Sequence, residues 1–311
     1  MRIDAHAHEY PAPFLECIES LVRRGKYPAP SYPLNPWDPD GHLGLLDEEG
    51  IDLQVISPMA AVYPTDRKEA SALTRGANDP LWEACRAHPD RYTALAYIPL
   101  VPIDLGIAEL ERAAGESATR GVVIGTTVNG KPLDDPGLAP FFEALDRTGL
   151  PALLHPMDAF EREGLRDFRL DIAVGWLFET TLAVSRLILS GMLDRYPRIP
   201  FILSHLGGGT HYLMERIILA GNRGRMKDPV RDYFRRFYYD TAGPVSAQAV
   251  ACGLSLVGPE RILLGTDYPF GPEGGREFIR RAIACVEGAT DSAEERERIF
   301  SGNARRLFGG P

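Results

Sequence analysis

The chain has 311 residues, of which 44% are hydrophobic and 25% charged, and its formal net charge at pH 7 is −9. This composition is typical of a globular protein with a large apolar core. An acidic chain with scattered arginines argues against nucleic acid and anionic membranes as partners. No uninterrupted apolar run reaches the roughly 18 residues that a membrane span needs.

The cysteines and the N-terminus both favour a cytoplasmic protein. Asp4 and His6 interrupt the first residues, where a signal peptide would need an apolar stretch. The four cysteines lie far apart and form no C-x-x-C pair, which predicts reduced thiols that pack as small hydrophobic groups. They are Cys17, Cys85, Cys252 and Cys285.

Eight short runs rich in apolar or β-branched residues predict strands. In chain order they span residues 2–8, 52–57, 92–99, 121–126, 151–156, 200–205, 237–242 and 261–267. Amphipathic segments at 79–91, 104–116 and 138–149 predict helices between them. Eight strands alternating with helices predict an α/β fold, a (β/α)8 barrel formed as one domain by residues 1–311. A doubly wound open sheet is the alternative, but no G-x-G-x-x-G follows the first strand.

Two segments interrupt this repeat. Residues 9–40 contain seven prolines, and so many prolines predict no regular helix. Because this segment follows the first strand, we expect it to lie over the top of the barrel as a lid or wall. Residues 156–176, after the fifth strand, form a second long excursion.

Histidine and aspartate side chains gather at the ends of the predicted strands. Asp4, His6 and His8 alternate along the first strand and therefore share one face. Three further groups end later strands, namely His155 the fifth, His205 the sixth and Asp267 the eighth. Catalytic groups of barrels collect at this rim, and imidazole nitrogen with carboxylate oxygen binds catalytic zinc or similar ions. The sequence therefore predicts a divalent-metal site with a position left open for water or substrate.

Three histidines lie elsewhere. His42 follows the proline-rich segment, His88 lies near a predicted helix end and is taken as structural, and His211 stays open. The glycines of SHLGGG, just before His211, permit positive φ, so they either leave room for a ligand or form a tight strand-to-helix turn. In GTDYPF, a buried Asp267 would need a partner for its charge, which a metal ion would supply.

Four stretches carry a family likeness: IDAHAH, LLHP, FETTLAVSRLILSGMLDRYPRIPFILSHLGGG and LLGTDYPF. With the terminal GNARRLF, they resemble the amidohydrolase superfamily, in its aminocarboxymuconate-semialdehyde decarboxylase-like branch. The resemblance implies a (β/α)8 TIM barrel with one divalent metal ion, for which we expect zinc first and manganese second. Members of that branch are nonoxidative decarboxylases of aromatic or enoic acids, with some hydratases and hydrolases.

The resemblance also implies roles for the residues at the strand ends. The metal ligands of the family match His6, His8, His155 and Asp267. His205 matches the catalytic histidine beside the metal, and Asp267 can combine ligation with proton relay.

The lysines bear on the number of metal ions. Binuclear members of the superfamily use a bridging lysine at the end of strand four. None of this chain's four lysines lies in GVVIGTT, and Lys131 follows several residues later. One ion per chain is therefore expected. Asp4 has no ligand role in the motif, so we expect a supporting role for it.

The family's substrate pocket is only partly matched. In the name-giving decarboxylase an arginine that holds a substrate carboxylate ends the stretch matching WDPDGH, but His42 stands there and lacks the bidentate fork. A tryptophan of the family is Met157 here. A second substrate arginine, donated across a dimer interface, matches Arg216. The resemblance thus implies a homodimer, with His42 and Arg216 as candidate substrate-binding residues.

We therefore expect a metal-dependent nonoxidative decarboxylase, a carbon–carbon lyase, that acts on a small aromatic or enoic carboxylic acid. In this hypothesis His205 takes or delivers the proton while the metal holds the carboxylate or a neighbouring hydroxyl. A hydrolase or hydratase using the same mononuclear site is the alternative, because both reactions need the same ligands. A third alternative is a noncatalytic barrel with a structural metal, but structural zinc sites are usually closed and rich in cysteine.

Overall fold

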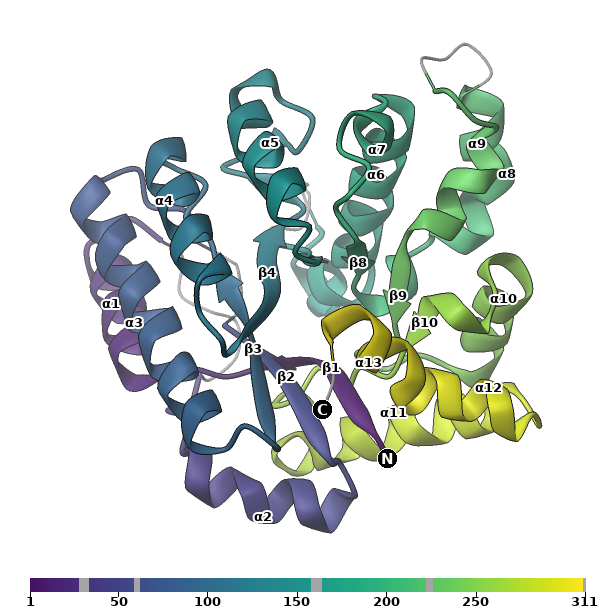
Figure 1. The fold of residues 1–311 in the computed structure, drawn as a ribbon, viewed down its shortest axis with the longest axis horizontal. Coiled ribbons are helices and arrows are strands. Elements are labelled where there is room, and N and C mark those ends of the chain that lie inside the picture. Colours follow the sequence, from purple (N-terminus) through teal and green to yellow (C-terminus); the bar gives the residue numbers. More distant parts are fainter. Residues whose placement is uncertain (28–33, 59–61, 158–163, 222–225, 310–311) are drawn as a thin grey trace.

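The computed structural model describes residues 1–27, 34–58, 62–157, 164–221 and 226–309. Its centre is one eight-stranded sheet, in the order β1-β2-β3-β4-β7-β8-β9-β10, and every neighbouring pair is parallel (Figure 1). The strands are β1 Ile3–His8, β2 Leu53–Ser57, β3 Tyr92–Tyr97, β4 Thr119–Gly125, β7 Ala152–His155, β8 Phe201–Leu203, β9 Tyr238–Asp240 and β10 Ile262–Leu263. Each falls within or overlaps one of the eight predicted runs. A two-stranded ribbon, β5 Thr127–Val128 with β6 Lys131–Pro132, follows β4.

The residues after β10 close the sheet into a barrel. The backbone N–H of Ala5 donates to the carbonyl of Leu264 at 2.8 Å, and that of Asp267 donates to the carbonyl of His6 at 2.9 Å. Further along, Ala7 and Tyr268 form a parallel bridge. These bonds join the first and last strands, so the prediction of a (β/α)8 barrel is confirmed and the open sheet is excluded.

Helices surround the barrel (Figure 1). They are α1 Ala12–Arg23, α2 Pro39–Glu49, α3 Arg67–Ala87, α4 Ile103–Ala114, α5 Ala139–Thr148, α6 Trp176–Leu189, α7 Met192–Arg195, α8 Thr210–Gly221, α9 Val230–Tyr233, α10 Ala247–Val257, α11 Arg276–Ala289, α12 Ala293–Glu297 and α13 Asn303–Phe308. Every residue of β1, β2 and β7 is buried. Strands covered on both faces need apolar residues without alternation, which explains the continuous apolar runs of the sequence.

The proline-rich segment is partly helical, which corrects the expectation for residues 9–40. Helix α1 occupies Ala12–Arg23, preceded by Pro11 and with a second proline, Pro13, in its first turn. Proline is tolerated there because the first N–H groups of a helix have no partner within it. Residues 28–33 of the predicted lid lie outside the described residues.

The second excursion leads into an unusually apolar helix. A short 3-10 turn at Asp167–Arg169 and a π-helical turn at Asp171–Gly175 run directly into α6. The stretch Asp167–Leu189 is long and apolar enough to cross a membrane by length and composition, and 44% of its most apolar window is buried inside the protein. Ala183, Val184 and Leu187 pack inward, so this stretch is a helix of the barrel's outer ring with a second apolar face.

Candidate metal centre

Four side chains from three places in the chain converge at the end of the barrel where the strands terminate. His6 and His8 come from β1, His155 ends β7, and Asp267 follows β10. One ligand atom from each lies within 4.8 Å of the other three, and all four residues are buried. The Nε2 atom of His8 lies 3.0 Å from the Nε2 atom of His6 and 3.2 Å from the Nε2 atom of His155. Asp267 Oδ1 lies 3.4 Å from His8 Nε2 and 3.6 Å from His6 Nε2.

Two hydrogen bonds turn these imidazoles toward their common centre. His6 Nδ1 lies 2.7 Å from Asp240 Oδ2, and His155 Nδ1 lies 2.8 Å from the carbonyl oxygen of Pro156. Both partners are acceptors, so Nδ1 carries the proton and donates it in each ring. The Nε2 atom of each ring is then left with a lone pair that faces the cluster, as metal ligation requires.

The charges of this cluster fit a cation at its centre. Burial opposes the charged form of His6, but the carboxylates of Asp240, Asp267 and Asp4 outweigh it and raise its pKa to about 9. Burial lowers the pKa of His8, and burial with the neighbouring imidazoles lowers that of His155 far more.

Asp267 completes this picture. Burial alone would raise the pKa of its carboxyl, but the neighbouring imidazoles of His205, His8 and His6 hold it well below the ordinary range. Its Oδ1 is buried and has no hydrogen-bond partner among the described residues. The neutral imidazoles of His8 and His155, the imidazole of His6 once a cation replaces its proton, and an ionised carboxylate form a donor set that fits a divalent ion.

His205 lies beside the four-residue cluster. It follows β8, and its backbone N–H donates to Asp240 Oδ1 at 2.9 Å. Its Nε2 lies 3.6 Å from Asp267 Oδ2, and its ring centroid lies 5.6 Å from that of His155. The backbone φ of His205 is +55°, an uncommon value that turns the side chain at the strand end. A proton carried by this ring can therefore reach the space next to the cluster.

Asp4 is not one of the four clustered ligand residues. Its carboxylate accepts hydrogen bonds from Thr266 Oγ1 at 2.6 Å, from the Thr266 backbone at 3.0 Å and from Gln54 Nε2 at 2.9 Å. These bonds tie β1 and β2 to the turn that carries Asp267. Asp4 therefore helps to hold β1 and the Asp267 turn in register.

A cavity of about 1510 Å³ lies at this end of the barrel, with His205 and Asp267 in its wall. Aromatic side chains line it, including Trp37, Trp176 and Tyr268. The described part of the proline-rich segment contributes residues 35–38, so this part forms a wall of the cavity.

Two arginines line the same cavity. Arg276 is held by Glu48 at 2.7 Å and by Glu49 at 3.1 Å. Arg169 forms no ion pair with any residue that the structure describes. Of these two cations, Arg169 is therefore the one left available to an anionic ligand.

The structure separates the two candidate substrate residues. His42 is buried in the cavity wall, where its Nε2 lies 3.1 Å from Gln54 Oε1, and burial lowers its pKa to about 4. Arg216 is exposed on α8 and does not line the cavity of its own chain. Met157 is buried and also lies outside the cavity lining.

Two acidic residues of the site were not singled out in the sequence. Asp240 ends β9 and lies within the seventh predicted run, 237–242, so a search for acidic residues near strand ends would have found it as well as Asp267. Glu9 directly follows His8 and lines the cavity. The only sequence feature that marks Glu9 is its position directly after the H-x-H pair.

Comparison with known proteins places this chain in a family. A family model described as amidohydrolase matches residues 3–310. The chain belongs to the amidohydrolase family. It is 30% identical over 284 residues to 2-amino-3-carboxymuconate-6-semialdehyde decarboxylase of Dictyostelium discoideum, covering 88% of this chain and 77% of that protein. It is 32% identical over 297 residues to γ-resorcylate decarboxylase of Rhizobium radiobacter, covering 86% of each.

A solved structure agrees with these relatives. The dihydroxybenzoic acid decarboxylase of Polaromonas sp. JS666, with bound manganese and the inhibitor 2-nitroresorcinol, matches with a TM-score of 0.81 and 27% identity, over 99% of this chain and 96% of that one. These findings confirm the prediction of a metal-dependent nonoxidative decarboxylase of this branch, a carbon–carbon lyase. They also support a divalent metal ion as the cofactor of the amidohydrolase described here.

Proposed function

We propose that this amidohydrolase removes carbon dioxide from a hydroxylated aromatic carboxylic acid. In this proposal His6, His8, His155 and Asp267 hold one divalent ion, and His205 supplies the proton. The observation that carries the proposal is the convergence of these four ligand atoms within 4.8 Å beside a cavity that also exposes His205.

Zinc is the ion that we propose first. Three imidazole nitrogens and one carboxylate oxygen form a donor set that suits zinc, and manganese is the second candidate because a relative binds it. A divalent ion bound there acts as a Lewis acid toward a substrate oxygen. The protein's contribution is to fix the imidazole tautomers through Asp240 and the carbonyl of Pro156.

The chemical step assigned to His205 is proton delivery to the ring carbon that bears the carboxylate. The ring π electrons form the new C–H bond, and a neighbouring hydroxyl loses its proton as the ring becomes a dienone. The bond to the carboxylate then breaks and carbon dioxide leaves, while the electron pair restores the aromatic ring as a phenolate, which takes a proton back onto its oxygen. Asp267, 3.6 Å from His205 Nε2, stabilises the positively charged imidazole before the transfer.

The cavity suits a flat aromatic acid. Trp37, Trp176 and Tyr268 offer ring faces and edges to a planar substrate. Arg169 offers an uncommitted guanidinium for an anionic group. The relatives named for γ-resorcylate and dihydroxybenzoic acid act on rings of this kind, which makes hydroxybenzoates the first substrates to assay.

We also propose that the protein is a homodimer through α6 and α8. These helices pack against each other and expose large apolar side chains: Phe178 is 52%, Leu182 46%, Tyr212 90% and Leu219 72% exposed. An apolar face of this kind is typical of an interface. It also explains why α6 is apolar on both sides.

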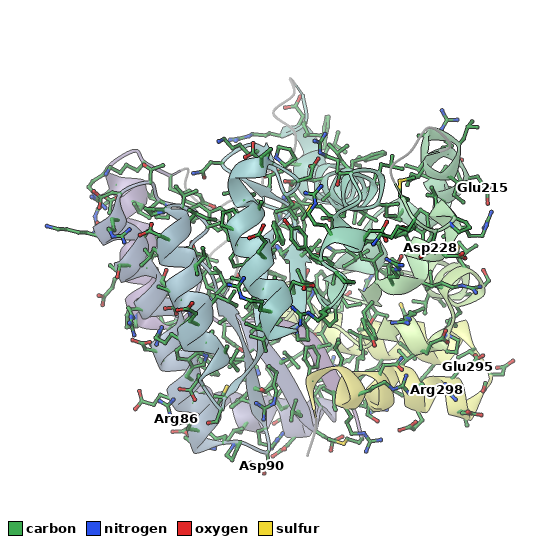
Figure 2. All side chains as sticks on the ribbon, turned by 45° about the horizontal axis from the view of Figure 1, so that its top comes forward. Arg86, Asp90, Glu215, Asp228, Glu295 and Arg298 are labelled. Carbon is green, nitrogen blue, oxygen red and sulfur yellow. The ribbon has the colours of Figure 1, made fainter. Side chains whose placement is uncertain are left out.

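Arg216 belongs to the same surface. Tyr212, Arg216 and Leu219 are spaced by four and three residues on α8 and therefore share one helix face. The adjacent Glu215 lies at the edge of the molecule (Figure 2). Since Arg216 does not line the cavity of its own chain, the dimer would bring it to the cavity of the partner, where it would bind an anionic substrate group.

The test is an assay of the purified, metal-loaded protein on γ-resorcylate and other hydroxybenzoates in heavy water. We expect release of carbon dioxide and a product that carries one deuterium on the carbon that bore the carboxylate. A hydrolase or hydratase would instead incorporate oxygen from ¹⁸O-labelled water and release no carbon dioxide. That second result, on these or on enoic acids, would overturn the proposal.

A further inference from the structure

Glu9 is a buried acid in the cavity wall next to the candidate metal centre. It directly follows His8, is only 3% exposed and lines the cavity together with His42 and Tyr268. Its backbone is fixed, because its N–H donates to the carbonyl of Ser57 at 2.9 Å. Its Oε1 is fully buried, yet it accepts no hydrogen bond from any described residue. A buried acceptor without a donor lowers stability, so its retention calls for an explanation.

The neighbouring His42 does not supply the missing donor. Its Nε2 lies 3.6 Å from Glu9 Oε1, beyond hydrogen-bond distance. That Nε2 lies 3.1 Å from Gln54 Oε1, and the amide of Gln54 donates to Asp4 at 2.9 Å. The carboxylate of Asp4 can only accept, so it fixes the direction of these hydrogen bonds. The amide nitrogen of Gln54 faces Asp4, the Gln54 oxygen therefore accepts, and His42 Nε2 donates to it. His42 is therefore committed, and the lone pairs of Glu9 Oε1 stay open.

We propose that Glu9 is a specificity-determining residue, whose Oε1 accepts a hydrogen bond from a hydroxyl or amino substituent on the ring of the substrate. This inference rests on the proposed function, since it names the substrate class of the same cavity: aromatic acids with a second, hydrogen-bond-donating substituent. A methoxy group at the same ring position has no hydrogen to donate and would leave Oε1 unpaired. A site built around a donor rejects analogues that lack it more strongly than an apolar pocket rejects a change in size.

The test measures binding, so that it does not depend on turnover. The probes are 2-nitrophenols, each carrying a hydroxyl, an amino or a methoxy group at one of the remaining ring positions. Dissociation constants are measured with the metal-loaded protein. At one ring position, we expect the hydroxyl and amino compounds to bind at least about tenfold more tightly than the methoxy compound. Equal binding at every position would overturn the inference.

Three variants assign the preference to Glu9. Glu9→Leu should reduce the ratio to about twofold or less, whereas Glu9→Gln, which keeps an acceptor oxygen, should retain most of it. Glu143→Leu is the matched control, because Glu143 is an exposed acid on α5 that does not line the cavity, and it should keep the wild-type ratio. Metal content, measured by mass spectrometry, should be the same in all four proteins. A Glu9→Leu protein that keeps the wild-type ratio would overturn the inference.

Stability gives a second readout that separates a functional from a structural role. Replacing an unpaired buried acid with leucine should raise the urea midpoint of unfolding, whereas an acid needed for folding would lower it. A lowered midpoint would count against the inference. If the binding preference is present but no hydroxybenzoate releases carbon dioxide, the proposed function fails and the role of Glu9 stands. If carbon dioxide is released but no binding preference is found, the proposed function stands and the role of Glu9 fails.

Discussion

Asp240 Oδ2 lies 2.7 Å from His6 Nδ1, and the other oxygen of the same carboxylate accepts the backbone N–H of His205 at 2.9 Å. One buried side chain therefore orients both a proposed metal ligand and the proposed proton donor. Asp240 also accepts the backbone N–H of Ala242 at 3.1 Å, which fixes the carboxylate itself. The placement of the two histidines thus depends on a residue that is not one of the four clustered ligand residues.

Replacing Asp240 with asparagine should therefore weaken metal binding. An amide accepts through one oxygen only, so it cannot serve both His6 Nδ1 and the backbone of His205 as a carboxylate does. We expect the affinity for zinc to fall about 10- to 100-fold. Competition with a chelator measures it. Asp228→Asn is the control, because Asp228, which is labelled in Figure 2, is exposed and forms an ion pair with Arg236. Unchanged affinity in Asp240→Asn would contradict the prediction.

His205→Asn should separate chemistry from metal binding. Removing the proton donor should lower kcat by about 10²- to 10⁴-fold, because His42, which also lines the cavity, already donates its Nε2 hydrogen to Gln54. Bound metal should stay at the wild-type level, since His205 is not among the four clustered ligands. Steady-state kinetics and metal analysis of the same sample check both parts. Loss of the metal with the activity would make His205 a ligand instead.

The barrel and the metal cluster were predictable for related reasons. Strands covered on both faces leave continuous apolar runs, and alternation within β1 places His6 and His8 on one face. Groups that end different parallel strands meet at one rim, which brought His155 and Asp267 to the same place without any knowledge of contacts.

The incorrect or missing predictions have two causes. Some rest on a general rule for one residue type that has an exception, and others concern features that depend on tertiary contacts. Proline forbids helix interiors but not first turns, so α1 was missed within residues 9–40. Helix α3 begins at Arg67, where Asp66 caps it, although only residues 79–91 were predicted as helical. The role of Glu9 depends on which way the hydrogen bonds of Gln54 and His42 point, and no sequence pattern records that direction.

The number of metal ions per chain can be predicted from the positions of the lysines. Lys131, the lysine that follows strand four most closely, lies exposed in β6, whereas the four clustered residues are all buried. Without a bridging lysine, one ion per chain is expected. Mass spectrometry of protein reconstituted with excess zinc and then desalted checks this. Two ions per chain would refute the mononuclear site.

The dimer can be tested by mixing two variants of reduced activity. Arg216→Ala should lower kcat/KM because the partner's cavity loses its arginine, and His205→Asn should inactivate its own cavity. In a mixed dimer the cavity with an intact His205 receives Arg216 from the other chain. A 1:1 mixture allowed to exchange should therefore recover about a quarter of the wild-type activity. No recovery in exchanged dimers would contradict the trans role of Arg216.

The interface itself calls for a separate variant. Leu219 is 72% exposed on the same face of α8, so Leu219→Glu should split the dimer without disturbing the barrel core. Sedimentation velocity should show a species of half the wild-type mass. Glu143→Leu, a substitution at an exposed position on α5, is the control for a change of surface charge and should leave the dimer intact. A Leu219→Glu protein that sediments like the wild type would contradict the proposed interface.

His211 should make the protein less stable in acid. It is buried in α8 with no hydrogen-bond partner at Nε2 among the described residues, and burial lowers its pKa to about 4. The unfolded chain takes up this proton near pH 6.5, so between pH 6.5 and 4 the unfolded state binds more protons. The free energy of unfolding therefore falls as the pH falls through this window, by up to about 3 kcal/mol from this residue alone.

His211→Leu removes that penalty. Urea unfolding of wild type and variant at pH 7.5 and pH 4.5 gives the measurement, and metal-free protein is used so that proton competition at the metal ligands affects both alike. We expect the loss of stability between the two pH values to be about 2 kcal/mol smaller in the variant. Because each protein serves as its own reference at pH 7.5, any change in packing cancels. Equal losses in both proteins would show that His211 keeps an ordinary pKa in the fold.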